Sequence, residues 1–287
     1  MEPILSLSGV CKRLGEFALE DVGFSLPRGS IMGFVGPNGA GKTTTLKILL
    51  GLVRKDAGEV KVFGLDAESH GPQIRDRIGF VWDENVFYED FRVREIGTLL
   101  RRFYSAWDDG EFRRRLSQFE LPADRKVKDL SRGMKAKLAL AAALSHGAEL
   151  IVMDEPTSGL DPIFRAEMLD IVAQVISDER RSVLFSTHIT SDLEKIADYV
   201  TFIHRGRIVF SQVKDDLLAS YVRVKGGVEG LAAARPHLVG VREHEFGFEA
   251  LSTEREALRR LSGPPLALER ASIDDILVYS TKYARAK

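Results

Sequence analysis

Nine residues in the first quarter of the chain combine glycines, a lysine and threonines in an order that suits phosphate binding. They read Gly36-Pro37-Asn38-Gly39-Ala40-Gly41-Lys42-Thr43-Thr44 and match the pattern G-x-x-x-x-G-K-[ST]. Glycines let such a loop curl until its backbone N–H groups point inward at phosphate oxygens. The lysine of the pattern reaches the β- and γ-phosphates, and the hydroxyl after it binds Mg²⁺. The stretch therefore predicts a loop that binds a nucleoside triphosphate, with Mg²⁺ on Thr43.

Two adjacent carboxylates, Asp154 and Glu155, follow the apolar run Leu150-Ile151-Val152-Met153. Such a run is typical of a buried strand, and open α/β sheets bind ligands at the carboxyl ends of their strands. We therefore expect Asp154 to hold Mg²⁺, directly or through water, and Glu155 to polarise the attacking water. An apolar run followed by two carboxylates is common by chance. It becomes a specific signal here because a phosphate loop lies upstream at a suitable separation.

His188 follows Phe185-Ser186-Thr187 at the end of another expected strand. A single histidine is most often a partly buried polar residue without a catalytic role. Its place at the end of an expected strand favours a position at the γ-phosphate, where the ring donates a hydrogen bond or orients water. Lys42, Glu155 and His188 are thus the three residues expected to take part in catalysis.

A further segment, Leu130-Ser131-Arg132-Gly133-Met134-Lys135, opens a helix that continues through an alanine-rich run to about Gly147. Ser131 suits the N-cap position, and Gly133 falls in the first turn. By itself the segment predicts an ordinary capped helix. Because a helix N-terminus also offers unpaired N–H groups, phosphate binding stays open as the alternative.

The elements that must position these residues alternate between strands and helices. Short apolar runs predict strands at about 31–35, 78–81, 150–153, 182–185 and 199–203. Because the runs are continuously apolar, they favour a parallel sheet covered on both faces, in the α/β class. Residues from about 84 to 147 show helical spacing and predict a helical subdomain.

Two domains are expected, at residues 1–217 and 218–287. A length of 287 residues suits one large domain with a small one. Residues 5–30 predict short strands ahead of the phosphate loop. Beyond Leu217 the pattern is strand-like, then helix-like, then strand-like again. It predicts a small C-terminal α/β appendage.

Composition narrows the class of protein. A net charge of −1 gives no general attraction to nucleic acid, and no nucleic-acid partner is expected. The single cysteine, Cys11, cannot form an intrachain disulfide, which fits a reducing compartment. No apolar stretch approaches the roughly 18 residues that span a bilayer, and no signal peptide is apparent. We expect a cytosolic protein that depends on a partner for any role at a membrane.

In order and spacing, the motifs resemble the ATP-binding subunits of ABC transporters over about residues 5–215. The resemblance implies a P-loop NTPase (RecA-like) core with an antiparallel β arm and a helical subdomain. It also implies two such domains that enclose two ATP molecules head to tail. Residues 36–44 match the Walker A loop and 150–155 the Walker B strand, with Glu155 as the catalytic carboxylate. The remaining matches are the signature loop at 131–134, the D-loop at 158–161 and the switch histidine His188, so that Ser131, Gly133 and Asp161 are expected to contact ATP.

Three departures from the family pattern affect the expected site. The signature is usually LSGGQ, but here it reads Leu-Ser-Arg-Gly-Met, with Arg132 and Met134. A glutamine usually follows the strand at 78–81, whereas Asp83 stands nearby and is expected to offer an oxygen to Mg²⁺. The aromatic residue that stacks on adenine should fall near Leu14, with Phe17 as the alternative. These departures indicate a slow or asymmetric ATPase.

Smaller patterns look like those of bacterial ABC-2-type exporters, with the bacitracin-resistance and acetoin-locus type as the most similar. They are the signature, the run at 187–193 and the ending at 271–276. The resemblance implies ATP and Mg²⁺ as ligands, and a head-to-tail dimer of the chain with itself or with a paralogous ATPase subunit. It also implies a separate transmembrane permease, so that the chain would be cytoplasmic and peripheral on the inner face of the membrane. The permease would dock near Val86-Phe87-Tyr88, unless these side chains belong to the core.

Three alternatives stay open. A soluble ABC ATPase of translation or DNA repair usually has two ATPase domains in one chain or a long coiled-coil insertion, and the sequence shows neither. An importing transporter would carry the same motifs. A P-loop kinase of small molecules would need neither the segment at 131–133 nor the loop at 158–161.

Overall fold

The computed structural model describes residues 2–261, 263 and 265–283, which divide into two compact units between Ser211 and Gln212. The residues at 284–287, part of the expected appendage, lie outside the described residues. The division comes slightly before the expected boundary after Leu217. Strand β10 (Arg207–Val213) continues directly into helix α8 (Lys214–Ser220), with no glycine or proline to mark a linker.

The first unit is built on a six-stranded sheet with the order β10-β9-β3-β8-β7-β6. The contacts of β3 with β8 and β9, and of β7 with β6 and β8, are parallel. Every residue of β3, β7 and β8 is buried, as the continuous apolar runs predicted. In addition to β10, the strands of this sheet are β3 (Ile31–Val35), β6 (Ile78–Val81), β7 (Leu150–Asp154), β8 (Ser182–Thr187) and β9 (Tyr199–His204).

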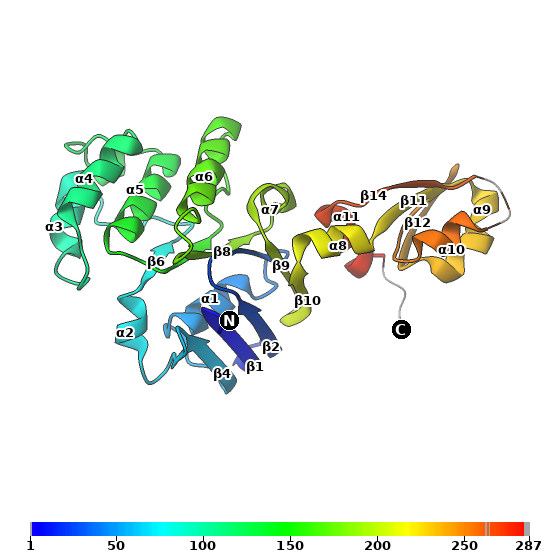
Figure 1. The fold of residues 1–287 in the computed structure, drawn as a ribbon, viewed down its shortest axis with the longest axis horizontal. Coiled ribbons are helices and arrows are strands. Elements are labelled where there is room, and N and C mark those ends of the chain that lie inside the picture. The colour runs from blue at the N-terminus through cyan, green and yellow to red at the C-terminus, as the bar shows by residue number, and fades with distance from the viewer. Residues whose placement is uncertain (1, 262, 264, 284–287) are drawn as a thin grey trace. The chain divides into compact units, whose positions relative to one another are not determined.

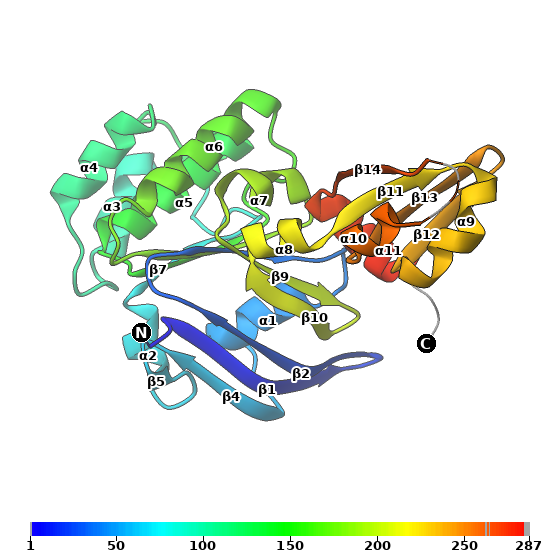
Figure 2. The same cartoon turned by 45° about the vertical axis from the view of Figure 1, so that its right-hand side comes forward.

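A second, antiparallel sheet forms the expected β arm, with the order β2-β1-β4-β5. Its strands are β1 (Leu5–Leu14), β2 (Phe17–Leu26), β4 (Ala57–Val62) and β5 (Leu65–Asp66), and Figure 2 shows β1, β2 and β4 side by side. The sequence predicted short strands where two ten-residue strands lie. Helix α1 (Lys42–Leu49) shares a core with both sheets, since Leu46 packs in one cluster with Leu19 and Phe34.

The segment between β6 and β7 contains helices and no assigned strand, as expected for the helical subdomain. Its α-helices are α3 (Val93–Leu100), α4 (Asp109–Gln118) and α5 (Arg132–Ser145), which gather at one end of the unit in Figure 1. Helix α5 packs directly on the sheet. A Cβ at Gly79 of β6 would lie 2.5 Å from the Cβ of Ala143, so only glycine lets the two elements approach this closely.

Three further α-helices belong to the first unit: α2 (Gly71–Arg75), α6 (Pro162–Val175) and α7 (Thr190–Ile196). Helix α6 follows β7, and α7 follows β8. The pattern predicted α6 but not α7, whose polar surface offers little helical periodicity. Leu193 anchors α7, because its side chain fills the space that a Cβ at Gly33 of β3 would occupy. In the described part of the chain, no helix is both long and apolar enough to cross a bilayer.

The second unit is an antiparallel sheet with the order β12-β13-β11-β14. Its chain order of β11, α9, β12, β13, α10 and β14 is that of the ferredoxin-like split β-α-β fold, followed by α11. The sequence pattern did not predict strand β14, because its side chains are largely exposed and apolar and polar residues alternate only weakly along it. The bounds are β11 (Val222–Gly226), α9 (Val228–Ala234), β12 (Gly240–His244), β13 (Gly247–Ser252), α10 (Arg255–Arg259), β14 (Ala267–Arg270) and α11 (Ile273–Thr281).

Candidate functional site

The phosphate loop lies between β3 and α1 and borders a cavity of about 440 Å³. Gly41 caps α1 with φ of 113°, a conformation that L side chains rarely adopt. A Cβ at Gly36 would lie 2.4 Å from the carbonyl oxygen of Ile203, so both positions require glycine. Gly36 and the buried Ala40 shape the loop from outside the cavity lining. That lining comprises Phe17, Pro37, Asn38, Gly39, Gly41, Lys42, Thr43, Thr44, Asp83 and Glu155.

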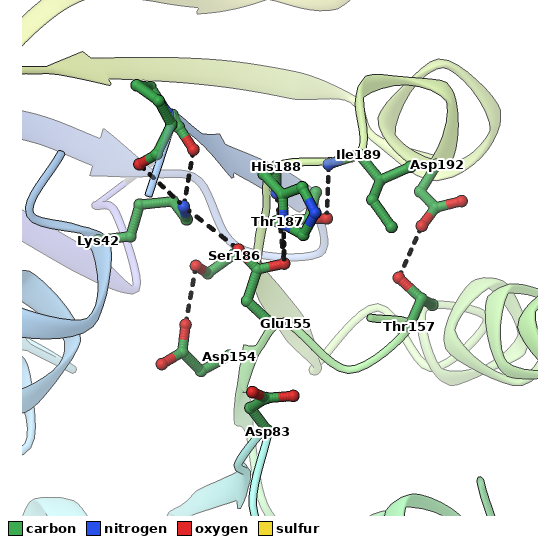
Figure 3. Close-up of polar contacts among 12 residues, drawn as sticks. Lys42, Asp83, Asp154, Glu155, Thr157, Ser186, Thr187, His188, Ile189 and Asp192 are labelled. Atoms are coloured by element: carbon green, nitrogen blue, oxygen red, sulfur yellow. Dashed lines mark hydrogen bonds and ion pairs between the residues drawn. The ribbon is translucent and has the colours of Figure 1, made fainter. Parts of the chain in front are cut away.

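Lys42 directs its ammonium group toward this cavity from the start of α1. The side chain is only 6% exposed, and Nζ donates to the carbonyl oxygens of Gly36 and Pro37 at 2.7 and 3.4 Å. Nζ also lies 3.2 Å from Glu155 Oε1 (Figure 3). The cation is thus held where phosphate oxygens would accept its hydrogen bonds, and it faces the expected catalytic carboxylate.

Asp154 is buried at the end of β7, between two hydroxyl groups. Thr43 Oγ1 donates to its Oδ2 at 2.8 Å, and Ser186 Oγ donates to its Oδ1 at 3.0 Å. Burial raises the pKa of Asp154, against the opposing effect of these two hydrogen bonds. A nearby dication would reverse the balance and favour the carboxylate.

The donor set at Asp154 fits Mg²⁺. Mg²⁺ usually takes one or two carboxylates together with water and substrate phosphates, rather than a cage of protein ligands. Among the described residues, no group of three or more His, Cys, Asp or Glu side chains is placed to hold a metal. The Thr43 hydroxyl and the Asp154 carboxylate are the hard oxygen donors that such a partial site requires.

Glu155 and His188 meet between the ends of β7 and β8. The imidazole Nδ1 lies 2.8 Å from Glu155 Oε2, and the backbone N–H of His188 donates to the same oxygen at 3.3 Å (Figure 3). Glu155 has φ of 50°, in the left-handed region that glutamate seldom occupies. Its N–H donates to the Ser186 carbonyl at 2.9 Å. The expected base and the expected histidine are therefore brought together by a strained turn.

Asp83 lines the phosphate-loop cavity, but its carboxylate forms an ion pair with Arg132 at the start of α5. Arg132 also packs against the loop that follows Glu155. Its Nη1 would lie 2.6 Å from a Cβ at Gly159. Two departures from the family pattern, Asp83 and Arg132, are thus direct partners.

Ser131, Gly133 and Asp161 do not line the phosphate-loop cavity. Ser131 Oγ accepts from the N–H of Met134 at 3.2 Å, as expected for the N-cap of α5. Asp161 caps α6 and accepts from the N–H groups of the next turn. Gly133 packs on Phe164 of α6, where a Cβ would lie 3.1 Å from the ring. The structure therefore separates these three residues from the nine-residue loop.

Sequence reasoning missed several polar residues behind the site. Ser186 was not among the predicted site residues, although it is the β8 residue in register with Asp154. Thr157 and Asp192 were also missed, and they join the loop that carries Glu155 to helix α7, which begins just after His188 (Figure 3). Strand adjacency was the available signal for Ser186. Thr157 and Asp192 gave none, because a carboxylate on a short polar helix usually faces water.

Comparison with known proteins is consistent across sequence families and solved structures. The family described as ABC transporter matches residues 19–158. The Nod factor export ATP-binding protein I of Ralstonia nicotianae is 31% identical over 288 residues, covering 97% of this chain and 82% of that protein. The daunorubicin resistance ATP-binding protein DrrA3 of Streptomyces coeruleorubidus is 32% identical, covering 94% and 89%. The bacitracin transport ATP-binding protein BcrA of Bacillus licheniformis is 32% identical over 212 residues, covering 73% and 69%.

Solved structures resemble mainly the part of the chain that carries the motifs. An ATP-binding subunit of an ABC transporter superposes with a TM-score of 0.67 at 27% identity, covering 75% of this chain and 91% of that one. The ADP conformation of an ATP-binding cassette, MJ1267, superposes with a TM-score of 0.65 at 24% identity, which supports the fold alone. The Ralstonia and Streptomyces relatives, by contrast, extend over nearly the whole chain.

Proposed function

Because this chain belongs to the ABC transporter family and is one of its ATP-binding subunits, we propose that it hydrolyses Mg·ATP to drive export through a separate permease. The observation that carries the proposal is that Lys42 and Glu155 line one cavity as an ion pair, while His188 is held against Glu155. With ATP labelled at the γ-phosphate, the purified chain should release labelled inorganic phosphate. Label recovered on a small organic acceptor would instead indicate a kinase.

In the proposed mechanism Lys42 turns from Glu155 to the β- and γ-phosphates of ATP. Glu155 is then free to accept a proton from the water that attacks the γ-phosphorus, while the bond to the bridging oxygen breaks and ADP leaves. His188, held against Glu155, orients that water or donates to the γ-phosphate. Phe17 is the aromatic candidate for contact with adenine, since it lines the same cavity while Leu14 does not.

Thr43 and Asp154 would hold Mg²⁺, and Asp83 is proposed as a third oxygen donor once it leaves Arg132. The metal supplies positive charge that offsets the charge developing on the phosphate oxygens. The chain's part is to keep the carboxylate and the hydroxyl together, which the Thr43–Asp154 hydrogen bond already does. Arg132 therefore competes with the metal for Asp83.

Replacing Arg132 with alanine should lower the Mg²⁺ concentration needed for half-maximal ATP binding, by up to about fivefold. The limit follows from the roughly 0.2–1 kcal/mol typical of exposed ion pairs, and both Arg132 and Asp83 are partly exposed. Titration of a fluorescent ATP analogue with Mg²⁺ measures the shift. A control with Asp83→Asn added should cancel it. An unchanged Mg²⁺ dependence in Arg132→Ala would show that Asp83 is no ligand.

We further propose that two copies, or one copy and a paralogue, close head to tail around two ATP molecules. Ser131, Gly133 and Asp161 lie away from the phosphate loop of their own chain, and a second subunit would give them a nucleotide to contact. Helix α5 begins with backbone N–H groups of the kind that suit a γ-phosphate, and Ser131 Oγ accepts from the one of Met134. The presence of Arg132 there adds a cation.

The proposed docking surface for the permease comprises Val86, Phe87, Tyr88 and Phe91, in the segment between β6 and α3. Val86 and Tyr88 are 59% and 64% exposed, and Tyr88 and Phe91 have ring centroids 5.2 Å apart. Phe87 lines a cavity of about 260 Å³ together with Trp82 and Ala139 of α5. An apolar surface beside a cavity suits a cytoplasmic helix of the permease. The chain would then be cytoplasmic and peripheral on the inner face of the membrane.

Replacing Tyr88 with aspartate should reduce co-purification with the permease by about tenfold or more, since a charge would face an apolar contact. Quantitative pull-down from detergent extract measures the effect. Phe103→Asp is the matched control, because Phe103 is 72% exposed in the same helical subdomain and lies outside the docking surface. Equal retention of the permease by both variants would place docking elsewhere.

A further inference from the structure

The loop after β7 is joined twice to the segment that follows β8, which comprises His188 and helix α7. The first junction is the contact between Glu155 and His188. The second lies behind it, where Thr157 Oγ1 donates to Asp192 Oδ2 at 2.7 Å. Thr157 is two residues beyond Glu155, and Asp192 is four beyond His188. Asp192 has no exposed surface, and Thr157 is also buried. Figure 3 shows the two junctions together.

Arg165 of α6 completes the second junction. Its Nε donates to Asp192 Oδ1 at 2.7 Å, and its Nη2 donates to Ser191 Oγ at 2.8 Å. Both carboxylate oxygens of Asp192 therefore have partners, one on the loop after β7 and one on α6. The side chain of Arg165 is 29% exposed, so the buried carboxylate is neutralised by a cation that reaches water.

A buried carboxylate is expensive to desolvate, and a well-packed apolar residue often gives equal or greater stability. A role in fixing geometry is therefore the better explanation of Asp192. The geometry that Asp192 would fix is that of Glu155, whose backbone occupies a left-handed conformation with φ of 50°. Such a residue stays in place only when its surroundings hold it. Anchoring Thr157 fixes the chain on the far side of that strained residue.

We propose that Asp192, held by Arg165, is a positioning residue that fixes the Glu155 carboxylate against His188 by anchoring Thr157. The inference rests on the proposed ATPase mechanism and adds to it the residues that set the distance between the base and the histidine. None of the three touches the phosphate-loop cavity in the described chain. They act through Glu155, on turnover rather than on ATP affinity.

The test begins with the matched pair Thr157→Val and Thr157→Ser. Valine keeps the shape but removes the hydrogen bond to Asp192, and kcat should fall about 10- to 100-fold, the scale for a misplaced catalytic group. KM and the Kd for ATP should change less than about twofold. Serine restores the hydroxyl and should restore kcat to within about threefold of the natural chain. Asp192→Asn should reproduce the valine effect.

Two further comparisons separate positioning from a general structural role. In a Glu155→Gln background, Asp192→Asn should cause no additional loss of residual hydrolysis, because the group it positions is gone. Asp198→Asn is the matched control, since Asp198 lies on the same segment but accepts from the N–H of Ile31 at the other end of the sheet. The kcat of Asp198→Asn should stay within about twofold of that of the natural chain.

Specific results would overturn the positioning role. The role would be wrong if Thr157→Ser were as slow as Thr157→Val, or if the affinity for ATP fell in step with kcat. It would also be wrong if Asp192→Asn caused its full loss of hydrolysis in the Glu155→Gln background. Failure of the proposed function would look different, because the natural chain itself would then release no phosphate.

Discussion

Replacing Glu155 with glutamine is expected to slow ATP hydrolysis by roughly 10²- to 10⁴-fold, the contribution typical of a positioned general base. The amide keeps the size and the contact with His188 but cannot accept a proton from water. ATP binding should persist or strengthen, since the anion that faces Lys42 and the phosphates is removed. Release of inorganic phosphate measures the rate, and equilibrium dialysis measures the binding.

The same variant tests the proposed dimer. With hydrolysis blocked, a competent ATP sandwich should accumulate, and light scattering should show a shift from monomer to dimer on addition of Mg·ATP. A monomer that still binds ATP would indicate a need for a paralogue or the permease. Glu149→Gln is the control, because Glu149 precedes the same strand at its opposite end and pairs with Arg77. A control as slow as Glu155→Gln would remove the case for a specific base.

Replacing Lys42 with alanine should weaken ATP binding by at least about 10- to 100-fold. Hydrogen bonds to charged groups are each worth about 1.5–3 kcal/mol, and Lys42 is placed to donate to two phosphates. The variant also leaves Glu155 without its cation beside the incoming phosphates. Calorimetric titration with Mg·ATP measures the loss of affinity.

Lys47→Ala provides the comparison for this second variant. Lys47 lies on the same helix but is exposed in its last turn. Removing it costs only the few tenths of a kcal/mol that a cation contributes near a helix C-terminus. ATP affinity should therefore be nearly unchanged. Equal losses in the two lysine variants would show that bulk charge, and not the buried ammonium, attracts the nucleotide.

The parallel sheet was predictable from sequence because its strands β3, β7 and β8 are buried on both faces and therefore mostly apolar. Elements with exposed surfaces were harder. Helix α7 and strand β14 have little periodicity, since one is fixed by Leu193 filling the space above Gly33 and the other by pairing with β11. Such tertiary contacts leave no regular pattern in a short segment.

The site was predictable where a motif sets local geometry, as in the phosphate loop. The site was less predictable where its residues lie far apart in the sequence and pair only in the folded chain. Asp83 was predicted as a metal ligand because it stands near the place where the family usually has a glutamine, but its pairing with Arg132 depends on how α5 packs. The network of Thr157, Arg165 and Asp192 comes from three segments that meet only in the folded chain. Nothing in their spacing marks them.

The placement of β3 in the middle of its sheet has a consequence for biosynthesis. Its two neighbours are β8 and β9, and roughly 150 residues are made between Val35 and Ser182. At about 5–20 residues per second, the strand that carries the phosphate loop waits on the order of ten seconds for its partners. During that interval the apolar edges of β3 have no sheet to join. A nascent chain therefore acquires its ATP site late, and a ribosome that stalls before β8 leaves an aggregation-prone strand exposed.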